Sequence, residues 1–159
     1  MRSARYVPTS ALAISLLAEA AEFIRDFEGD MIVEFAQQIK CSTSQKHRDE
    51  SIADIVDMNR RVRFATNFVT ALKSAKVGEE LFFDGVGLEV LDRGLEFMQD
   101  NLAEMVTEPM WEVTRKTKGQ AVISFTQDEF TKLREAVELA IERADTAAAL
   151  LKEIRSIPR

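Results

Sequence analysis

The hydrophobic positions of the chain recur at helical spacing along most of its length. In residues 9–40 and again in residues 45–76, apolar side chains three or four positions apart share one helix face. Thr9 or Ser10 can cap the first helix, and Gly29 either lies within it or divides it in two. The first face comprises Leu17, Ala20, Ile24, Phe27, Met31 and Phe35, and the second comprises Ile52, Ile55, Met58, Val62, Ala65, Val69 and Leu72.

The same periodicity predicts two further helices. Residues 86–106 place Leu88, Leu91, Leu95, Met98, Leu102 and Met105 on one face. A capping box, Thr126-Gln-Asp-Glu129, starts the terminal helix, which we expect to end near Ser156. Its apolar seam from Phe130 to Ile154 resembles a coiled-coil seam. The seam can either pack within the chain or dock on a second copy to make a homodimer.

The segments between these helices are less regular. Residues 107–125 carry two stretches rich in β-forming residues, 110–115 and 121–125, which favour a β-hairpin. The alternative is a short helix that ends at Gly119, with Pro109 in its first turn. Within residues 77–86, we expect Leu81, Phe82 and Phe83 to fill the core. The predicted fold is mainly α, a single-domain antiparallel bundle of three to four long helices with this short hairpin.

Composition supports one folded domain inside the cell. The chain has 159 residues, of which 46% are hydrophobic, enough to build one buried core. No apolar run approaches the roughly 20 residues that a membrane span requires. We expect no signal peptide, because the apolar run after Arg5 is short and Glu19 and Glu22 follow it. The single cysteine, Cys41, cannot form an internal disulfide, and we therefore expect a cytoplasmic protein.

The negative charge of the chain is concentrated in one segment. Residues 78–112 hold ten acids and one base, a net charge of −9, whereas the whole chain carries −6. Five of these acids, three or four positions apart, form what we call the acidic stripe: Glu89, Asp92, Glu96, Asp100 and Glu104. Like charges at this spacing destabilise an isolated helix. We expect a cationic counterpart, either the base-rich helix of residues 45–76 or a basic partner.

Few residues offer catalytic or metal-binding chemistry. His47 is the only histidine, so His-rich zinc and di-iron sites are excluded. Cys41 and His47 would have to form any Cys–His pair, but one lies in a predicted loop and the other in a polar helix start. Gly85-Val-Gly87 lacks the strand and the lysine of a phosphate-binding loop. We predict no catalytic residue, cofactor or metal from these patterns.

Two pairs of carboxylates suggest an enzymatic alternative. Glu19-Ala-Ala-Glu22 and Asp54-Ile-Val-Asp57 resemble the acidic magnesium ligands of the all-α nucleotide pyrophosphohydrolases. The resemblance implies a magnesium-dependent enzyme whose four carboxylates face a helical cleft. The second pair begins with Asp54 where the family favours Glu, and all four acids fall on polar helix faces.

The favoured function is non-enzymatic. We predict an acidic helical protein that docks on a basic surface of a protein partner, as inhibitors, immunity proteins and phage anti-defence factors do. The acidic stripe would supply the electrostatics, and Trp111 the apolar anchor. Direct binding to nucleic acid is not expected, because the net negative charge repels phosphates. A self-assembling structural subunit is the third alternative.

Overall fold

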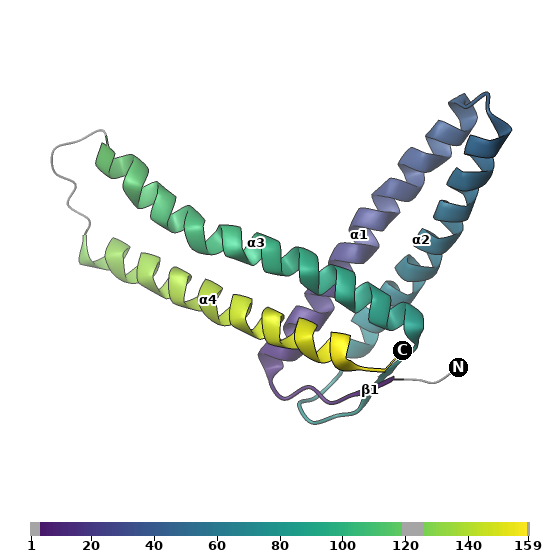
Figure 1. Cartoon of the computed structure of the whole chain (residues 1–159). Helices are drawn as coiled ribbons and strands as arrows, with labels where there is room; N and C mark the ends of the chain where they lie inside the picture. Colours follow the sequence, from purple (N-terminus) through teal and green to yellow (C-terminus); the bar gives the residue numbers. More distant parts are fainter. Residues whose placement is uncertain (1–3, 119–125, 159) are drawn as a thin grey trace.

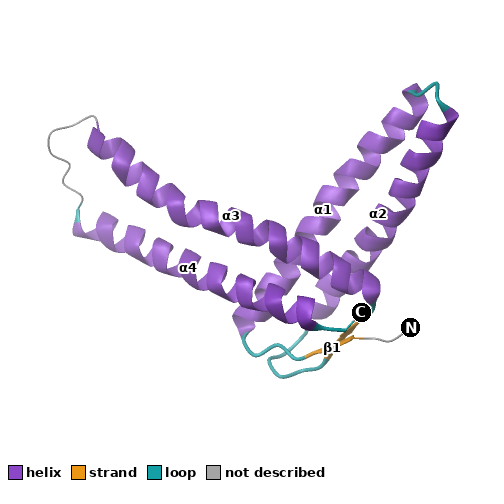
Figure 2. Cartoon of the chain, viewed as in Figure 1, coloured by secondary structure: helices purple, strands orange, loops and turns teal. Residues whose placement is uncertain are grey.

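Four long helices dominate the part of the chain that the structure describes. The computed structural model describes the backbone of residues 4–118 and 126–158, and their side chains outside residues 102–118. A small two-stranded sheet completes the fold (Figure 2), and the predicted mainly-α class is confirmed. The elements are β1 (Ala4–Tyr6), α1 (Ala11–Cys41), α2 (Gln45–Leu72), β2 (Leu81–Phe83), α3 (Gly85–Lys118) and α4 (Gln127–Ser156).

The helices form two antiparallel hairpins that cross. One hairpin is α1 with α2, and the other is α3 with α4. The hairpins cross near one end and then diverge as two arms (Figure 1). The predicted antiparallel packing is therefore found within each hairpin, while the two hairpins lie across one another rather than side by side. We call residues 29–57, the free end of the first hairpin, the α1–α2 arm.

The two hairpins meet closely where α1 crosses α3. A Cβ atom at Gly94 would overlap the backbone carbonyl of Ala20 and would also touch the Ala20 side chain. Only glycine allows this approach of the two helices, because any other residue would push them apart. Gly94 therefore fixes the place at which the hairpins cross, which we call the crossing.

Buried side chains concentrate around the crossing. Four sets share one core: Ala13 to Ile24 of α1, Ala65 to Leu72 of α2, Leu88 to Met98 of α3, and Ala147 to Ile154 of α4. In the last set, Ala147, Leu151 and Ile154 belong to the predicted seam of the terminal helix. That part of the seam packs within the chain and is not available to a second copy. In the α1–α2 arm, by contrast, the only buried residue is Ser51.

The helix starts follow the sequence closely. The Ser10 hydroxyl accepts a hydrogen bond from the Ala13 N–H at 3.0 Å, so Ser10 caps α1. Ser44 caps α2 in the same way. The capping box of α4 is confirmed, with the Thr126 and Glu129 side chains each bonded to the other residue's backbone N–H. Helix α1 continues unbroken through Gly29, which resolves the question left open by the sequence.

The predicted hairpin in residues 107–125 is wrong in its first half. Helix α3 continues to Lys118, so residues 110–115 are helical, as in the alternative interpretation. Extending an existing helix needs no new nucleation, and this outweighs the modest helix penalty of Val and Thr. The second predicted strand, residues 121–125, lies outside the described residues.

The sheet joins the start of the chain to the connection between the hairpins. Strand β1 pairs antiparallel with β2, with Tyr6 opposite Leu81. Leu81 and Phe83 are buried, whereas Phe82 is 60% exposed. Successive strand residues point to opposite faces, so only alternate ones can reach the core. The prediction that this segment fills the core is thus confirmed for Leu81 and Phe83 and wrong for Phe82.

Candidate functional site

Three members of the acidic stripe are paired inside the fold. Glu89 accepts a hydrogen bond at 3.1 Å from Arg61 of α2. Arg155 of α4 donates to Asp92 at 2.6 Å and to Glu96 at 2.9 Å. These two hydrogen bonds, to Glu96 and Asp92, raise the pKa of Arg155 above its ordinary value. The internal cations therefore come from α4 as well as from the base-rich helix α2.

The rest of the stripe lies further along α3. Asp100 is exposed and makes no ion pair or hydrogen bond with the part of the chain that the structure describes. Glu104 and the predicted anchor Trp111 also lie on α3, but their side chains are outside the described residues. Their roles in partner binding stay predictions.

A buried ion network lies at the end of the shared core. The Glu28 side chain of α1 is only 5% exposed and accepts hydrogen bonds from Arg61 Nε at 2.8 and 2.9 Å. Arg93 of α3 donates to the same carboxylate at 3.2 Å. Burial alone would lower the pKa of Arg61, but its hydrogen bonds and the negative charges of Glu28 and Glu89 raise it overall. The network joins three helices through one carboxylate.

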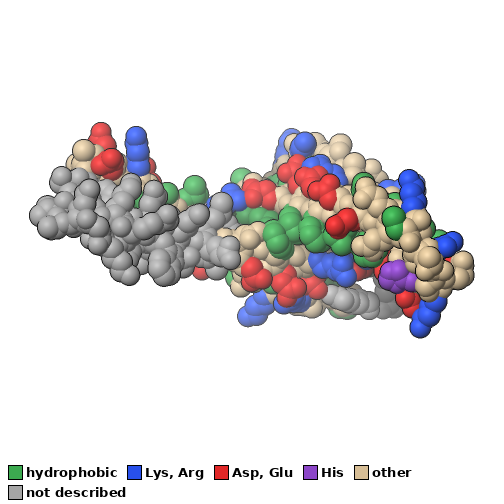
Figure 3. Space-filling model, turned by 90° about the horizontal axis from the view of Figure 1, so that it is seen from above, with side chains coloured by type: hydrophobic (Ala, Val, Ile, Leu, Met, Phe, Trp, Pro, Cys, Tyr) green, Lys and Arg blue, Asp and Glu red, His purple; other side chains and the backbone are tan. Residues whose placement is uncertain are grey.

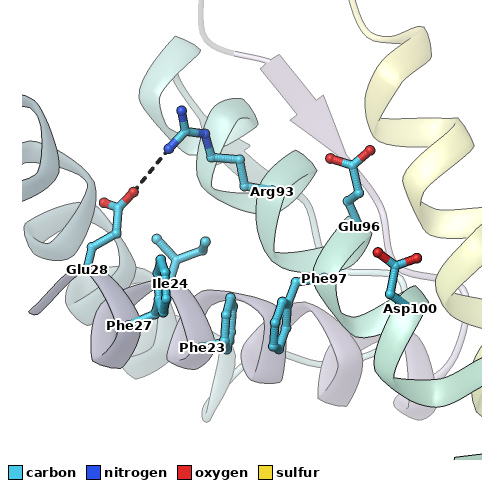
Figure 4. Close-up of a pocket in the computed structure, with 8 residues that line it drawn as sticks. All are labelled: Phe23, Ile24, Phe27, Glu28, Arg93, Glu96, Phe97 and Asp100. Atoms are coloured by element: carbon cyan, nitrogen blue, oxygen red, sulfur yellow. Dashed lines mark hydrogen bonds and ion pairs between the residues drawn. The ribbon is translucent and has the colours of Figure 1, made fainter. Parts of the chain in front are cut away.

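Next to this network, α1 and α3 enclose an open pocket of about 360 Å³. Figure 4 shows side chains from both helices converging on it, with Arg93 directed at Glu28. Two members of the acidic stripe, Glu96 and Asp100, belong to its lining. The full lining is Phe23, Ile24, Phe27 and Glu28 of α1, with Arg93, Glu96, Phe97 and Asp100 of α3.

Three phenylalanines of the pocket form one stack. The ring centroid of Phe23 lies 3.6 Å from that of Phe97 and 5.5 Å from that of Phe27, and the rings of both pairs are close to parallel. Phe27 is 52% exposed and Phe97 is 41% exposed. Figure 3, which looks down into the opening between the arms, shows hydrophobic side chains at the surface with acidic and basic ones beside them. Grouped, exposed apolar rings are typical of binding sites.

This stack departs from the core expected from the sequence. The sequence pattern predicts that Phe27 is on the buried face of its helix, but Phe27 lines the pocket and is exposed to solvent. Phe23 was not identified, although it precedes Phe27 by four residues and so shares its face. Phe97 was also missed, although it adjoins Glu96 of the stripe. The stack forms across two helices that are far apart in sequence, and only the crossing brings them together.

The carboxylates of the enzymatic alternative do not converge. Glu19 accepts a hydrogen bond from the Ser15 hydroxyl at 3.2 Å and is paired with Arg143 of α4. On α2, Asp54 is exposed and Asp57 lies 3.7 Å from Arg60. Within residues 4–101 and 126–158, no group of three or more His, Cys, Asp or Glu could hold a metal ion. The magnesium cluster implied by the resemblance is therefore not formed.

Cys41 and His47 lie at the turn between α1 and α2. Both line a shallow surface hollow with the three residues of the connecting loop. Cys41 is exposed, and no hydrogen bond joins it to His47 in the described structure. A Cys–His nucleophile pair requires the two side chains within hydrogen-bond reach, and this contact is missing between these two described residues.

Comparisons with known proteins provide no relative for this chain. No protein-family model, no curated protein and no solved structure matches it. Over the residues described, no helix combines the length and the apolar character needed to cross a membrane.

Proposed function

We propose that the chain is a non-enzymatic protein that binds a basic protein partner through the pocket between α1 and α3. The observation that supports this function best is the exposed phenylalanine stack beside Asp100, a carboxylate without a partner in the described structure. Aromatic faces attract cations, with about 0.5–1 kcal/mol at exposed sites. The alkyl stem of a lysine or arginine can also cover a phenylalanine ring while its charged head stays hydrated.

The charges of the pocket favour a cationic occupant. Its lining holds three carboxylates and one guanidinium group. Glu28 already binds two arginines, and Glu96 binds Arg155. Asp100 is therefore the first carboxylate available to an incoming cation. The occupant that fits is a protein segment presenting lysine or arginine next to an apolar side chain.

An inhibitory role follows naturally from such an occupant. Basic segments with exposed lysine or arginine line the grooves in which nucleic-acid-binding proteins hold phosphates. A protein that covers such a segment would exclude the nucleic acid. This is the manner of action of the inhibitor, immunity and anti-defence proteins that the acidic composition suggests. Electrostatic steering would speed the encounter and would weaken with added salt.

The test uses a fluorescently labelled helical peptide that has leucine surfaces and arginine surfaces. The negative probe is a peptide of the same pattern in which glutamate replaces each arginine. We expect fluorescence anisotropy to detect binding of the arginine peptide only. Phe97→Ala and Asp100→Lys should each weaken that binding about tenfold, equivalent to about 1.4 kcal/mol.

Matched controls separate the pocket from net charge and general hydrophobicity. Asp54→Lys makes the same charge change on exposed α2, and Val33→Ala removes an apolar side chain that is 58% exposed outside the pocket. Both control variants should bind the peptide as the unmodified chain does. Equal losses in Asp54→Lys and Asp100→Lys would show non-specific attraction and would refute a pocket site.

A further inference from the structure

Helix α2 carries an exposed basic face that the fold does not use. Residues 58–76 contain five bases and no acid. Arg61 belongs to the buried ion network. Arg63 and Lys73 are exposed and have no ion-pair partner among the described residues. Arg63 and Lys73 share one helix face with two exposed threonines between them, and the four residues are spaced by three, four and three positions. We call this set the basic face of α2: Arg63, Thr66, Thr70 and Lys73.

Helix α4 carries a matching acidic face. Four exposed carboxylates have the same spacing of three, four and three: Glu135, Glu138, Glu142 and Asp145. Glu138 lies 3.6 Å from Arg134. The other three have no hydrogen bond or ion pair with the described part of the chain. Leu139 and Ile141, beside this acidic face of α4, are 55% and 44% exposed.

The two faces cannot meet within one chain. Helices α2 and α4 belong to different hairpins, which diverge away from the crossing (Figure 1). Each face spans eleven residues, and its ten steps correspond to about 15 Å of helix. An antiparallel contact places Arg63 opposite Asp145 and Lys73 opposite Glu135. Thr70 and Thr66 then lie opposite Glu138 and Glu142, and the small threonine side chains allow the helix axes to come close.

We infer that the basic face of α2 docks on the acidic face of α4 in a second copy of this chain. The opposite charges and the shared spacing carry this assignment. Nucleic acid would also present negative charge to α2, but the net charge of −6 opposes it and the helical spacing has no counterpart in a phosphate backbone. Because each copy retains one unused face, the contact is heterologous and builds open chains or a closed ring.

This inference does not depend on the pocket between α1 and α3, since it uses none of the pocket residues. Sedimentation velocity at low salt tests it directly. The unmodified chain should show a mean mass that rises with concentration and returns to 18.0 kDa as salt screens the contact. The α2 variant Arg63→Glu, Lys73→Glu and the α4 variant Glu135→Lys, Asp145→Lys should each remain monomeric.

Mixing the two variants gives the decisive result. The α2 variant keeps an intact acidic face and the α4 variant keeps an intact basic face, so the mixture should assemble at a 1:1 ratio although neither variant assembles alone. A chain with all four substitutions should assemble again, because both facing charge pairs, 63 with 145 and 73 with 135, are exchanged rather than lost. As a control, Lys40→Glu with Lys46→Glu at the hairpin tip makes the charge change of the α2 variant and should leave assembly unaltered.

Three results would overturn the inference. The unmodified chain could stay at 18.0 kDa at every concentration and salt. The two variants could fail to associate when mixed, although circular dichroism shows both to be folded. Finally, the unmodified chain could be monomeric and bind duplex DNA in a way that the α2 variant loses, which would assign the basic face to a polyanion instead.

Discussion

The crossing and the α1–α2 arm share one amphipathic pattern but differ sharply in burial. At the crossing, Leu16, Leu91 and Leu95 have no exposed surface. In the arm, Ile52 and Val56 are about half exposed, at 49% and 54%. The difference arises because a side chain at the crossing is covered by a second hairpin, whereas one in the arm has only its partner helix. An amphipathic pattern therefore sets which face is apolar, and the tertiary arrangement decides whether that face is covered.

The largest expected effect comes from the buried ion network. Glu28→Gln keeps the side-chain shape but removes the charge shared by Arg61 and Arg93, and breaking a buried pair costs about 3–5 kcal/mol. Urea unfolding should show this loss of free energy of unfolding. Glu34→Gln, at an exposed site in the α1–α2 arm, should change stability by less than about 0.5 kcal/mol. A similar small effect at both sites would show that the network does not hold the crossing.

Truncating an apolar side chain should distinguish the two regions almost as strongly. Leu95→Ala leaves a cavity at the crossing and should destabilise the chain by about 2–5 kcal/mol. Val56→Ala, in the arm, removes a half-exposed side chain, and we expect a change within about 0.5 kcal/mol. Thermal denaturation followed by circular dichroism measures both. Comparable losses of stability would mean that side chains in the arm contribute as much to stability as core side chains, despite their exposure.

Glycine substitutions should change stability in opposite directions. Gly94→Ala forces a methyl group against the Ala20 carbonyl and should cost about 1–3 kcal/mol. At Gly29, in the arm, a Cβ meets nothing within 4 Å. Gly29→Ala should therefore stabilise helix α1 by about 0.5–1 kcal/mol. Chemical denaturation of the two variants checks the signs, and a stabilising Gly94→Ala would remove the basis for the close crossing.

The smallest expected effect is a loss of stability at alkaline pH, which arises from Tyr6 at the base of the crossing. Burial, together with the charge and hydrogen bond of Glu153, raises the pKa of Tyr6 above its ordinary value of about 10. Above pH 10 the unfolded chain loses the Tyr6 proton first. The stability contributed by this group is therefore complete below pH 10 and declines as pH rises further. Tyr6→Phe should flatten the decline in melting temperature, and an unchanged slope would contradict this assignment.

Much of the fold could be predicted from local sequence signals. The caps at Ser44 and Thr126 act through hydrogen bonds to residues three positions away, so their effect is visible in sequence. The helical periods follow from the same short-range geometry. The extension of α3 to Lys118 could not be predicted from local signals, because residues 110–115 are rich in β-forming types. An existing helix nevertheless continues easily through such residues.

Less of the candidate site could be predicted. The acidic stripe was visible as a spacing, but its pairing with Arg155 joins residues of different helices about 60 positions apart. The stacking of Phe23 on Phe97 likewise depends on where two hairpins cross. That crossing is permitted by Gly94, whose role could not be recognised without knowing what packs against it. Short-range rules identify faces, whereas contacts between faces need the tertiary structure.

Native-state hydrogen exchange, at a salt concentration that keeps the chain monomeric, tests the contrast between the two regions most directly. Amides of residues 16–24 and 88–98 should exchange only through global unfolding, because these segments form the shared core. Amides of the α1–α2 arm should open locally, at a clearly lower free energy. Equal protection in the arm and at the crossing would contradict the account, since it would show that both regions unfold as one cooperative core.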